Sequence, residues 1–135
     1  MSTKIYYPAV FQTEDIGYSV WIPDVQGCVS QGDTYEEAVD YISEALGLCL
    51  EDDLERGVKP PVPSAPNAIK LENNQFISII AFDPIEYQKK YSTKAVKKTL
   101  TIPNWLNTMS EREHINFSTV LQEALMEKLH LTNNI

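Results

Sequence analysis

The stretch Ala95-Val-Lys-Lys-Thr-Leu-Thr-Ile-Pro103 alternates apolar and polar residues and stops at a proline, which predicts one short strand. Its apolar face is interrupted only by Lys98, and its other face is wholly polar. A lone strand with unpaired edges and an apolar face is not stable in water, and its simplest partner is the same strand of a second copy. The sequence therefore predicts a two-stranded ribbon in a homodimer, with outward polar side chains at Lys97, Thr99 and Thr101.

Two helical patterns follow the predicted strand, from 103 to about 112 and from about 117 to 131. The order strand, helix, helix resembles that of the ribbon-helix-helix DNA-binding dimers, whose ribbon enters the major groove and reads bases with its outward side chains. This resemblance implies that Lys97, Thr99 and Thr101 contact bases. An ordinary solvated strand face is the alternative interpretation of the same three residues.

The start of the second helix is a candidate phosphate contact, because its first backbone N–H groups are free and its dipole favours an anion. The residues there are Asn116, Phe117 and Ser118, and simple capping by Asn116 or Ser118 is compatible with the same pattern. The chain has no glycine after Gly57, so we expect His114 or Asn116 to take the left-handed conformation between the helices. Apolar residues at helical and strand spacing, with Trp105 packed among them, predict the dimer core: Leu100, Ile102, Leu106, Met109, Val120, Leu121, Ala124, Leu125 and Leu129.

Charge is unevenly distributed in this chain of 135 residues, whose formal net charge is −8. Through Thr93 there are 15 acidic and 6 basic residues, giving −9, whereas from Lys94 onward there are 4 and 5, giving +1. This asymmetry favours a basic partner for the front part and phosphate for the back part, although an acidic surface kept for solubility is an equal alternative.

Cys28 and Cys49 fit no metal or redox spacing and are predicted to be buried thiols. No apolar run is long enough to span a membrane and no signal peptide is visible, so a cytoplasmic location is expected.

The front part predicts a sheet with one long helix. Strands are expected at 5–11, 18–22 and 28–30 as a meander, with Pro8 favouring a sheet edge or a bulge. The run Thr34-Tyr-Glu-Glu37 has the spacing of a capping box, and helical periodicity continues from there to Gly57. Four prolines within 58–67 predict an extended linker, before a buried strand at 76–82, at most a short helix over 83–91, and a hinge at Ser92 and Thr93.

Three runs in this front part form a recognisable signature, Gly17-Tyr-Ser-Val-Trp-Ile-Pro-Asp-Val-Gln-Gly-Cys28, Gln31-Gly-Asp-Thr34 and Glu36-Glu-Ala38. Through them the chain resembles the HicB antitoxins. Residues 97–103, Trp105-Leu106 and 116–125 are similar to the ribbon-helix-helix variant of that family. The resemblance implies an α+β fold: an N-terminal β-β-β-α-β partial, degenerate RNase H-like domain over 1–91, and a C-terminal ribbon-helix-helix (β-α-α) dimerisation and DNA-binding domain over 94–131.

The resemblance also implies partners. The family is encoded beside HicA, a small basic mRNA-cleaving toxin with a double-stranded-RNA-binding-domain-like fold and a catalytic histidine. We therefore expect an antitoxin that occludes a HicA-type toxin and represses its own operon. It would bind palindromic operator DNA as a homodimer or higher homo-oligomer, and linked N-terminal domains would bring two toxin copies to the DNA. No enzymatic activity, metal, cofactor or membrane contact is expected.

Two alternatives stay open. Carboxylates near one sheet edge suit Mg²⁺-dependent hydrolysis of nucleic acid, although each also fits a turn, a cap or a solvated helix face: Asp24, Asp33, Asp40 and Glu44. A His-based nuclease site in the front part is excluded, because the first histidine is His114. The other alternative is a transcriptional repressor whose front part senses a small ligand. Trp21 is a candidate aromatic anchor for a partner, with core packing equally possible.

Overall fold

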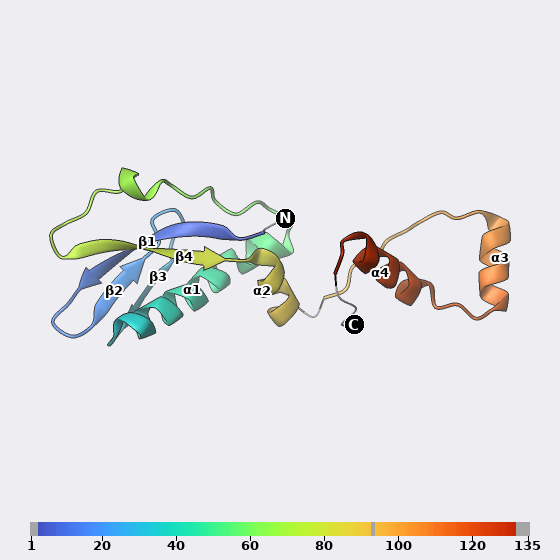
Figure 1. Cartoon of the computed structure of the whole chain (residues 1–135), viewed down its shortest axis with the longest axis horizontal. Coiled ribbons are helices and arrows are strands. Elements are labelled where there is room, and N and C mark those ends of the chain that lie inside the picture. The colour runs from blue at the N-terminus through green and yellow to red at the C-terminus, as the bar shows by residue number, and fades with distance from the viewer. Residues whose placement is uncertain (1–2, 93, 132–135) are drawn as a thin grey trace. The chain divides into compact units, whose positions relative to one another are not determined.

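The chain divides into two compact units in the computed structural model, which describes residues 3–92 and 94–131. The N-terminal unit is Met1–Lys94 and the C-terminal unit is Ala95–Ile135. Figure 1 shows a sheet with helices in the first unit and two helices in the second, so the fold is of the predicted α+β class. The predicted hinge at Ser92 and Thr93 includes Thr93, which lies outside the described residues.

A four-stranded antiparallel sheet forms the centre of the N-terminal unit, with the strand order β3-β2-β1-β4. The predicted meander is confirmed, because β1 (Ile5–Thr13), β2 (Tyr18–Trp21) and β3 (Val29–Gly32) pair in sequence order. The fourth strand, β4 (Gln75–Phe82), returns along the other side of β1. The sheet carries no charged side chain in any of its four strands.

The long helix α1 (Tyr35–Glu55) covers one face of this sheet. Its predicted capping box exists in a shifted form. Thr34 Oγ1 accepts from the backbone N–H of Glu37 at 3.1 Å, while the Glu37 carboxylate accepts from the N–H of Asp33 at 3.0 Å. The buried residues of the helix are Ala38, Ile42, Leu46 and Leu50. They form one core with buried residues of the sheet and of the end of β2: Tyr7, Ala9, Phe11, Val20, Ile22, Ile80 and Phe82.

Three predictions about burial and sheet position need correction. The strand at 76–82 is not buried but lies at a sheet edge, and within it Ile80 and Phe82 are the buried residues. Its apolar residues are divided between the face under α1 and the opposite face. Cys49 is exposed, whereas Cys28 is buried as expected. Pro8 lies in a central strand, but β2 pairs only with 10–13 of that strand, so the proline has a strand partner on one side alone.

The linker between α1 and β4 is tied to the sheet by side-chain hydrogen bonds. The hydroxyl of Tyr7 donates to the carbonyl of Pro61 at 2.6 Å. The carboxylate of Asp24 accepts from the backbone N–H of Ser64 at 2.9 Å and also from its hydroxyl. The linker contains one short 3-10 helix, η1 (Pro66–Ala68), and runs along the side of the sheet away from α1 (Figure 1).

Alkaline pH is expected to destabilise the N-terminal unit through Tyr7. Burial, and secondarily the charge of Asp24, raise the pKa of Tyr7 to about 12. An unfolded tyrosine ionises near pH 10, so folding favours the neutral phenol, and this contribution to stability is complete below about pH 10. The free energy of unfolding should fall by up to about 2 kcal/mol as pH rises from 10 toward 12. Urea unfolding at several pH values measures it. Tyr7→Phe should show a shallower loss over that window, and an unchanged slope would contradict the assignment.

A second helix, α2 (Pro84–Tyr91), closes the N-terminal unit, in agreement with the short helix expected there. Asp83 caps it, accepting from the backbone N–H groups of Ile85 and Glu86 at 3.1 and 3.3 Å. The helix packs on α1 at Gly47, where any added Cβ would lie 2.4 Å from a ring carbon of Tyr87. The absence of a side chain at Gly47 therefore allows this close approach.

The C-terminal unit contains α3 (Asn104–Arg112) and α4 (Phe117–Lys128), which confirms both predicted helices, although α4 ends earlier than expected. His114 between them has a φ of 54°, so it takes the left-handed conformation that the missing glycine required. The predicted strand at 95–103 is not formed. A strand is defined by hydrogen bonds to a neighbouring strand, and the described part of a single copy offers these residues none. No helix in the described ranges is long and apolar enough to cross a membrane.

Candidate functional site

The polar face of the segment 95–103 is open to solvent. Lys97, Thr99 and Thr101 are all exposed, as expected for side chains that contact a partner rather than a core. A lysine offers a cationic donor, and threonine offers a hydroxyl and a methyl group. These are the groups that read guanine, other base edges and the thymine methyl in the major groove.

A groove of about 510 Å³ separates this segment from the start of α4. Three polar residues contribute to its lining, Lys98, Asn107 and Ser118. The rest of the lining is apolar: Leu100, Ile102, Phe117, Val120, Leu121 and Ala124. The sequence pattern predicted most of these as dimer core. It did not identify Lys98 or Asn107 as groove residues, because each is polar and gives no hydrophobic signal.

The predicted dimer core is exposed in a single copy. Leu100 is 60% exposed, Val120 50% and Leu125 52%, while Ile102 and Leu106 are also exposed and Leu121 is partly covered. Within 95–131 no residue is buried. Such a continuous apolar surface on a small unit marks a site of protein association. Trp105 was expected to pack with this set, and in a single copy it is 65% exposed and does not line the groove, as is also true of Leu129 at 65%.

The start of α4 has the geometry of a capped helix end. Asn116 Oδ1 accepts from the backbone N–H of Thr119 at 3.1 Å, so the capping alternative is correct for Asn116. The N–H groups of Phe117 and Ser118, at the first two helical positions, have no acceptor one turn earlier in the helix and point outward from its end. The Phe117 ring belongs to the groove, so only its backbone is suited to an anion.

The carboxylates proposed for a metal nuclease have local structural roles or stand apart. Asp24 holds the linker through Ser64, and Asp33 lies directly before the cap of α1. Asp40 and Glu44 lie one helical turn apart on α1. Within residues 3–92 and 94–131, no group of three or more His, Cys, Asp or Glu side chains is placed to hold a metal ion.

Trp21 lies on the sheet face away from α1. Its strand neighbours Val20 and Ile22 are buried in the core, as the alternation of the strand predicts, while Trp21 itself is half-buried. Its register partners on the neighbouring strands are Val10 and Val29, so the indole shares their face. Core packing under the helix is therefore excluded for Trp21.

Comparison with known proteins places the chain in one family. A family model described as the HicB-like antitoxin of bacterial toxin–antitoxin systems matches residues 6–124, which include parts of both units. Antitoxin HicB 2 of Photorhabdus laumondii is 25% identical over 132 residues, covering 82% of this chain and 95% of its own length. A UPF0150 protein of Helicobacter pylori is 48% identical over 44 residues, covering 33% of this chain, and the chain spans only 61% of that relative.

A solved structure has the same fold over nearly the whole chain. It is a chain of a toxin–antitoxin complex from Streptococcus pneumoniae, 31% identical, with a TM-score of 0.58. The match covers 93% of this chain and 99% of that one. Family signature, fold and sequence identity thus agree, and the chain belongs to the HicB-like antitoxins of bacterial toxin–antitoxin systems.

Proposed function

We propose that this protein is an antitoxin that binds and occludes a HicA-type mRNA interferase and represses its own operon as a DNA-bound dimer. The observation that carries the proposal is the family match across both units, together with the open apolar groove beside 95–103. A structural relative is itself part of a toxin–antitoxin complex, which supports a toxin as the partner. In this proposal the N-terminal unit is a degenerate RNase H-like fold that acts by covering its partner.

Dimerisation would complete the C-terminal unit. Two copies of the segment 95–103 would pair as an antiparallel ribbon, satisfying the open backbone groups and burying the groove residues of both copies. The polar face of the ribbon, with Lys97, Thr99 and Thr101 from each copy, would then enter the major groove. The N-termini of the two α4 helices would hold phosphates and fix the register without reading sequence.

The charge distribution supports the division of labour between the units. The N-terminal unit, Met1–Lys94, has 15 acidic and 7 basic residues and a formal charge of −8, whereas the C-terminal unit, Ala95–Ile135, has 4 of each and a formal charge of zero. The front unit would therefore be drawn to a cationic RNA-binding toxin, and the back unit would approach DNA with little repulsion. Because a two-fold dimer carries two N-terminal units, one operator-bound dimer would hold two toxin molecules.

Lys97→Ala is expected to weaken binding to the DNA upstream of the gene by about 10–100-fold, because each dimer loses two charged base contacts. The slope of log K against log salt should also become shallower, because each dimer loses two positive charges at the DNA surface. Gel-shift titrations at several salt concentrations measure both quantities.

Lys128→Ala is the charge-matched control. It removes the same charge from the last turn of α4, away from the proposed ribbon, and is expected to change affinity by less than about 3-fold. Equal losses for the two variants would contradict base contact by Lys97. Failure of the wild-type protein to bind any upstream fragment would overturn the repressor part of the proposal.

A further inference from the structure

The side of α1 that faces away from the sheet forms a continuous exposed stripe. Its residues follow at spacings of four, three, four and four, which is one face of a helix. We call this stripe the α1 outer face, and it consists of Glu37, Tyr41, Glu44, Leu48 and Asp52. Two of its members are large apolar side chains that no core residue covers, since Tyr41 is 49% and Leu48 is 67% exposed.

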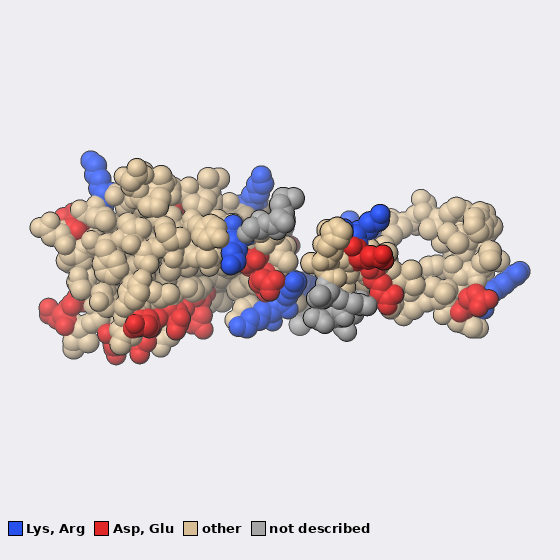
Figure 2. Space-filling model, viewed as in Figure 1, with Lys and Arg blue, Asp and Glu red and all other residues tan. Residues whose placement is uncertain are grey.

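The charge on this helix has one sign. α1 contains eight carboxylates and no lysine, arginine or histidine: Glu36, Glu37, Asp40, Glu44, Glu51, Asp52, Asp53 and Glu55. Figure 2 shows the acidic side chains gathered along the side of the N-terminal unit where α1 lies. A solvated helix face kept only for solubility ordinarily mixes both signs.

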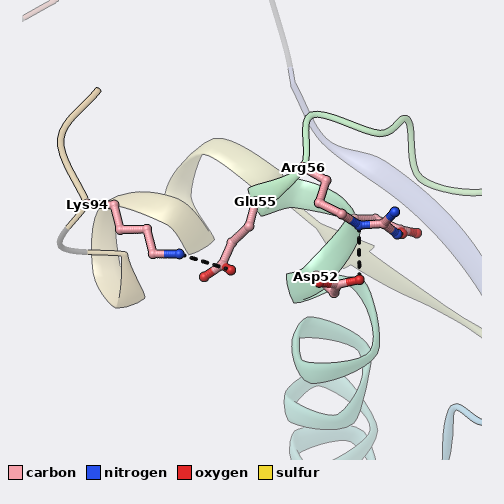
Figure 3. Close-up of polar contacts among 5 residues, drawn as sticks. Asp52, Glu55, Arg56 and Lys94 are labelled. Atoms are coloured by element: carbon pink, nitrogen blue, oxygen red, sulfur yellow. Dashed lines mark hydrogen bonds and ion pairs between the residues drawn. The ribbon is translucent and has the colours of Figure 1, made fainter. Parts of the chain in front are cut away.

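Within 3–92 and 94–131, the ion pairs made by α1 carboxylates lie at the C-terminal end of the helix. Arg56 pairs with Asp52 at 3.1 Å, and Lys94 pairs with Glu55 at 3.3 Å (Figure 3). Arg56 also pairs with Asp53 at 3.0 Å. Asp40 and Glu44, in the middle of the helix, form no ion pair within 3–92 and 94–131. Lys90 is the nearby cation, since it lines the same notch as these two carboxylates, and the rest of their field is directed at solvent.

The carboxylates at the C-terminal end of α1 have partners within the fold. Carboxylates near a helix C-terminus oppose the helix dipole, at roughly 0.3–1 kcal/mol each, yet four of them lie between 51 and 55. The last turn of α1 has no basic residue. Arg56 and Lys94 offset three of these four, and Glu51 accepts from the hydroxyl of Tyr87 at 3.2 Å. The carboxylates that attract a partner are therefore those of the central turns, Asp40 and Glu44.

A notch of about 320 Å³ adjoins the α1 outer face, where α1 meets α2 and the end of β4. Carboxylates and tyrosine rings make most of its wall: Asp40, Glu44, Asp83, Glu86, Tyr87 and Tyr91. The rings of Tyr87 and Tyr91 lie 4.7 Å apart, and the ammonium of Lys90 already lies 5.3 Å from the centroid of Tyr91. Carboxylates beside aromatic faces are suited to a guanidinium or ammonium group.

We propose that the α1 outer face and this notch are the docking surface for the basic, RNA-binding face of the toxin. The inference rests on the proposed antitoxin function and names the surface that performs it. Tyr41 and Leu48 would be buried at the centre of the contact, Glu44 would pair with a toxin cation beside them, and an arginine or lysine would enter the notch. A toxin whose cationic RNA-binding face is covered in this way cannot bind RNA.

The test measures binding of the full-length protein to the small basic protein encoded beside it, by calorimetry at low and moderate salt. Glu44→Lys is expected to weaken binding at least about 30-fold, because it replaces an attraction with a repulsion within the contact. Leu48→Ala should weaken it by about 5–30-fold without any change in charge. Glu72→Lys is the matched control, since it makes the same substitution in the linker, off α1, and should change affinity less than about 3-fold.

The outcomes separate this inference from the proposed function. If the wild-type protein fails to bind the basic protein at all, the antitoxin function itself is overturned. If the wild type binds but Glu44→Lys and Glu72→Lys weaken binding equally, only long-range charge matters and the docking surface is wrong. If the wild type binds and neither Glu44→Lys nor Leu48→Ala has an effect, the toxin docks elsewhere and the inference is likewise overturned. Thermal unfolding of each variant, monitored by circular dichroism, shows that the unit remains folded.

Discussion

Leu121→Glu is expected to make the protein monomeric and to abolish operator binding, while the N-terminal unit stays folded. Leu121 lies in the groove of the C-terminal unit, where Leu100, Ile102 and Val120 also contribute to the lining. In the proposed dimer this groove is closed by the second copy, so position 121 becomes part of a shared core. A carboxylate there would have to be taken out of water into a mostly apolar lining, where Lys98 is the cation present.

The expected effect is large because a two-fold interface contains each residue twice. Burying one leucine side chain contributes about 1.5–3 kcal/mol, and taking a carboxylate out of water costs several kcal/mol even where a cation is near. Even half of this cost in each copy would weaken dimerisation by more than about 100-fold. Operator binding falls with it, since a single 95–103 segment cannot form the ribbon and one half-site lacks the affinity of two.

Gln122→Glu provides the control for Leu121→Glu. It adds the same charge at the neighbouring position, which is exposed and does not line the groove, and should leave the dimer intact. Sedimentation equilibrium measures the association state, and a gel shift with upstream DNA measures binding. A Leu121→Glu protein that remains dimeric and binds DNA would show that the groove is not the dimer interface.

Elements set by local signals were predictable from the sequence. Helix α1 begins where Thr34 and Glu37 form a cap, and α4 begins at the cap made by Asn116. Both caps are short-range hydrogen bonds that the sequence spacing already contains. The left-handed residue between α3 and α4 was predictable in the same way, because a turn without glycine requires one of few residue types.

Features set by distant neighbours were not predictable from the sequence. The strand β4 is as apolar as a buried strand, yet its place at the sheet edge depends on which strand it pairs with. The segment 95–103 has the alternation of a strand, but strand hydrogen bonds need a partner that the described part of one copy does not contain. In both cases the hydrophobic pattern indicates which residues prefer burial. Which strand a segment pairs with depends on the rest of the fold or on a second copy.

The candidate site was predictable in part for the same reason. Apolar periodicity identified Leu100, Ile102 and Val120 as residues of one surface, and the structure places all three in the groove. Other residues predicted for the same core do not line the groove: Trp105, Leu106, Met109, Leu125 and Leu129. The α1 outer face gave only a weak sequence signal, since carboxylates on the exposed side of a helix are ordinary until the missing cations and the neighbouring notch are seen together.

Gly17→Ala is expected to destabilise the N-terminal unit by about 3–4 kcal/mol. Gly17 has a φ of 76°, a left-handed conformation that alanine adopts at a cost of about 1–2 kcal/mol. A Cβ there would also lie 2.1 Å from the carbonyl oxygen of Gly32 and 2.8 Å from Cα of Asp33. Both are backbone atoms at the junction of β3 and α1, so no side-chain rotation relieves the clash.

Gly27→Ala separates the two causes. Gly27 has a φ of 78°, nearly that of Gly17, but an added Cβ there meets no atom within 4 Å. It should therefore cost only the conformational term of about 1–2 kcal/mol, and the difference between the variants is the cost of the clash. In a Trp105→Phe background, Trp21 fluorescence reports unfolding of the N-terminal unit alone, because Trp21 and Trp105 are the two tryptophans of the chain.

A difference of about 2 kcal/mol between Gly17→Ala and Gly27→Ala corresponds to roughly 8–16 °C in melting temperature for a unit of this size. If the two substitutions lowered the free energy of unfolding equally, the turn between β1 and β2 would be able to move away from β3 and α1 with little loss of stability. That result would contradict a rigid junction at Gly32 and Asp33, which holds the first turn of α1 against the sheet. A larger loss for Gly17→Ala would instead establish that the glycine is required by close backbone packing, in addition to its dihedral angle.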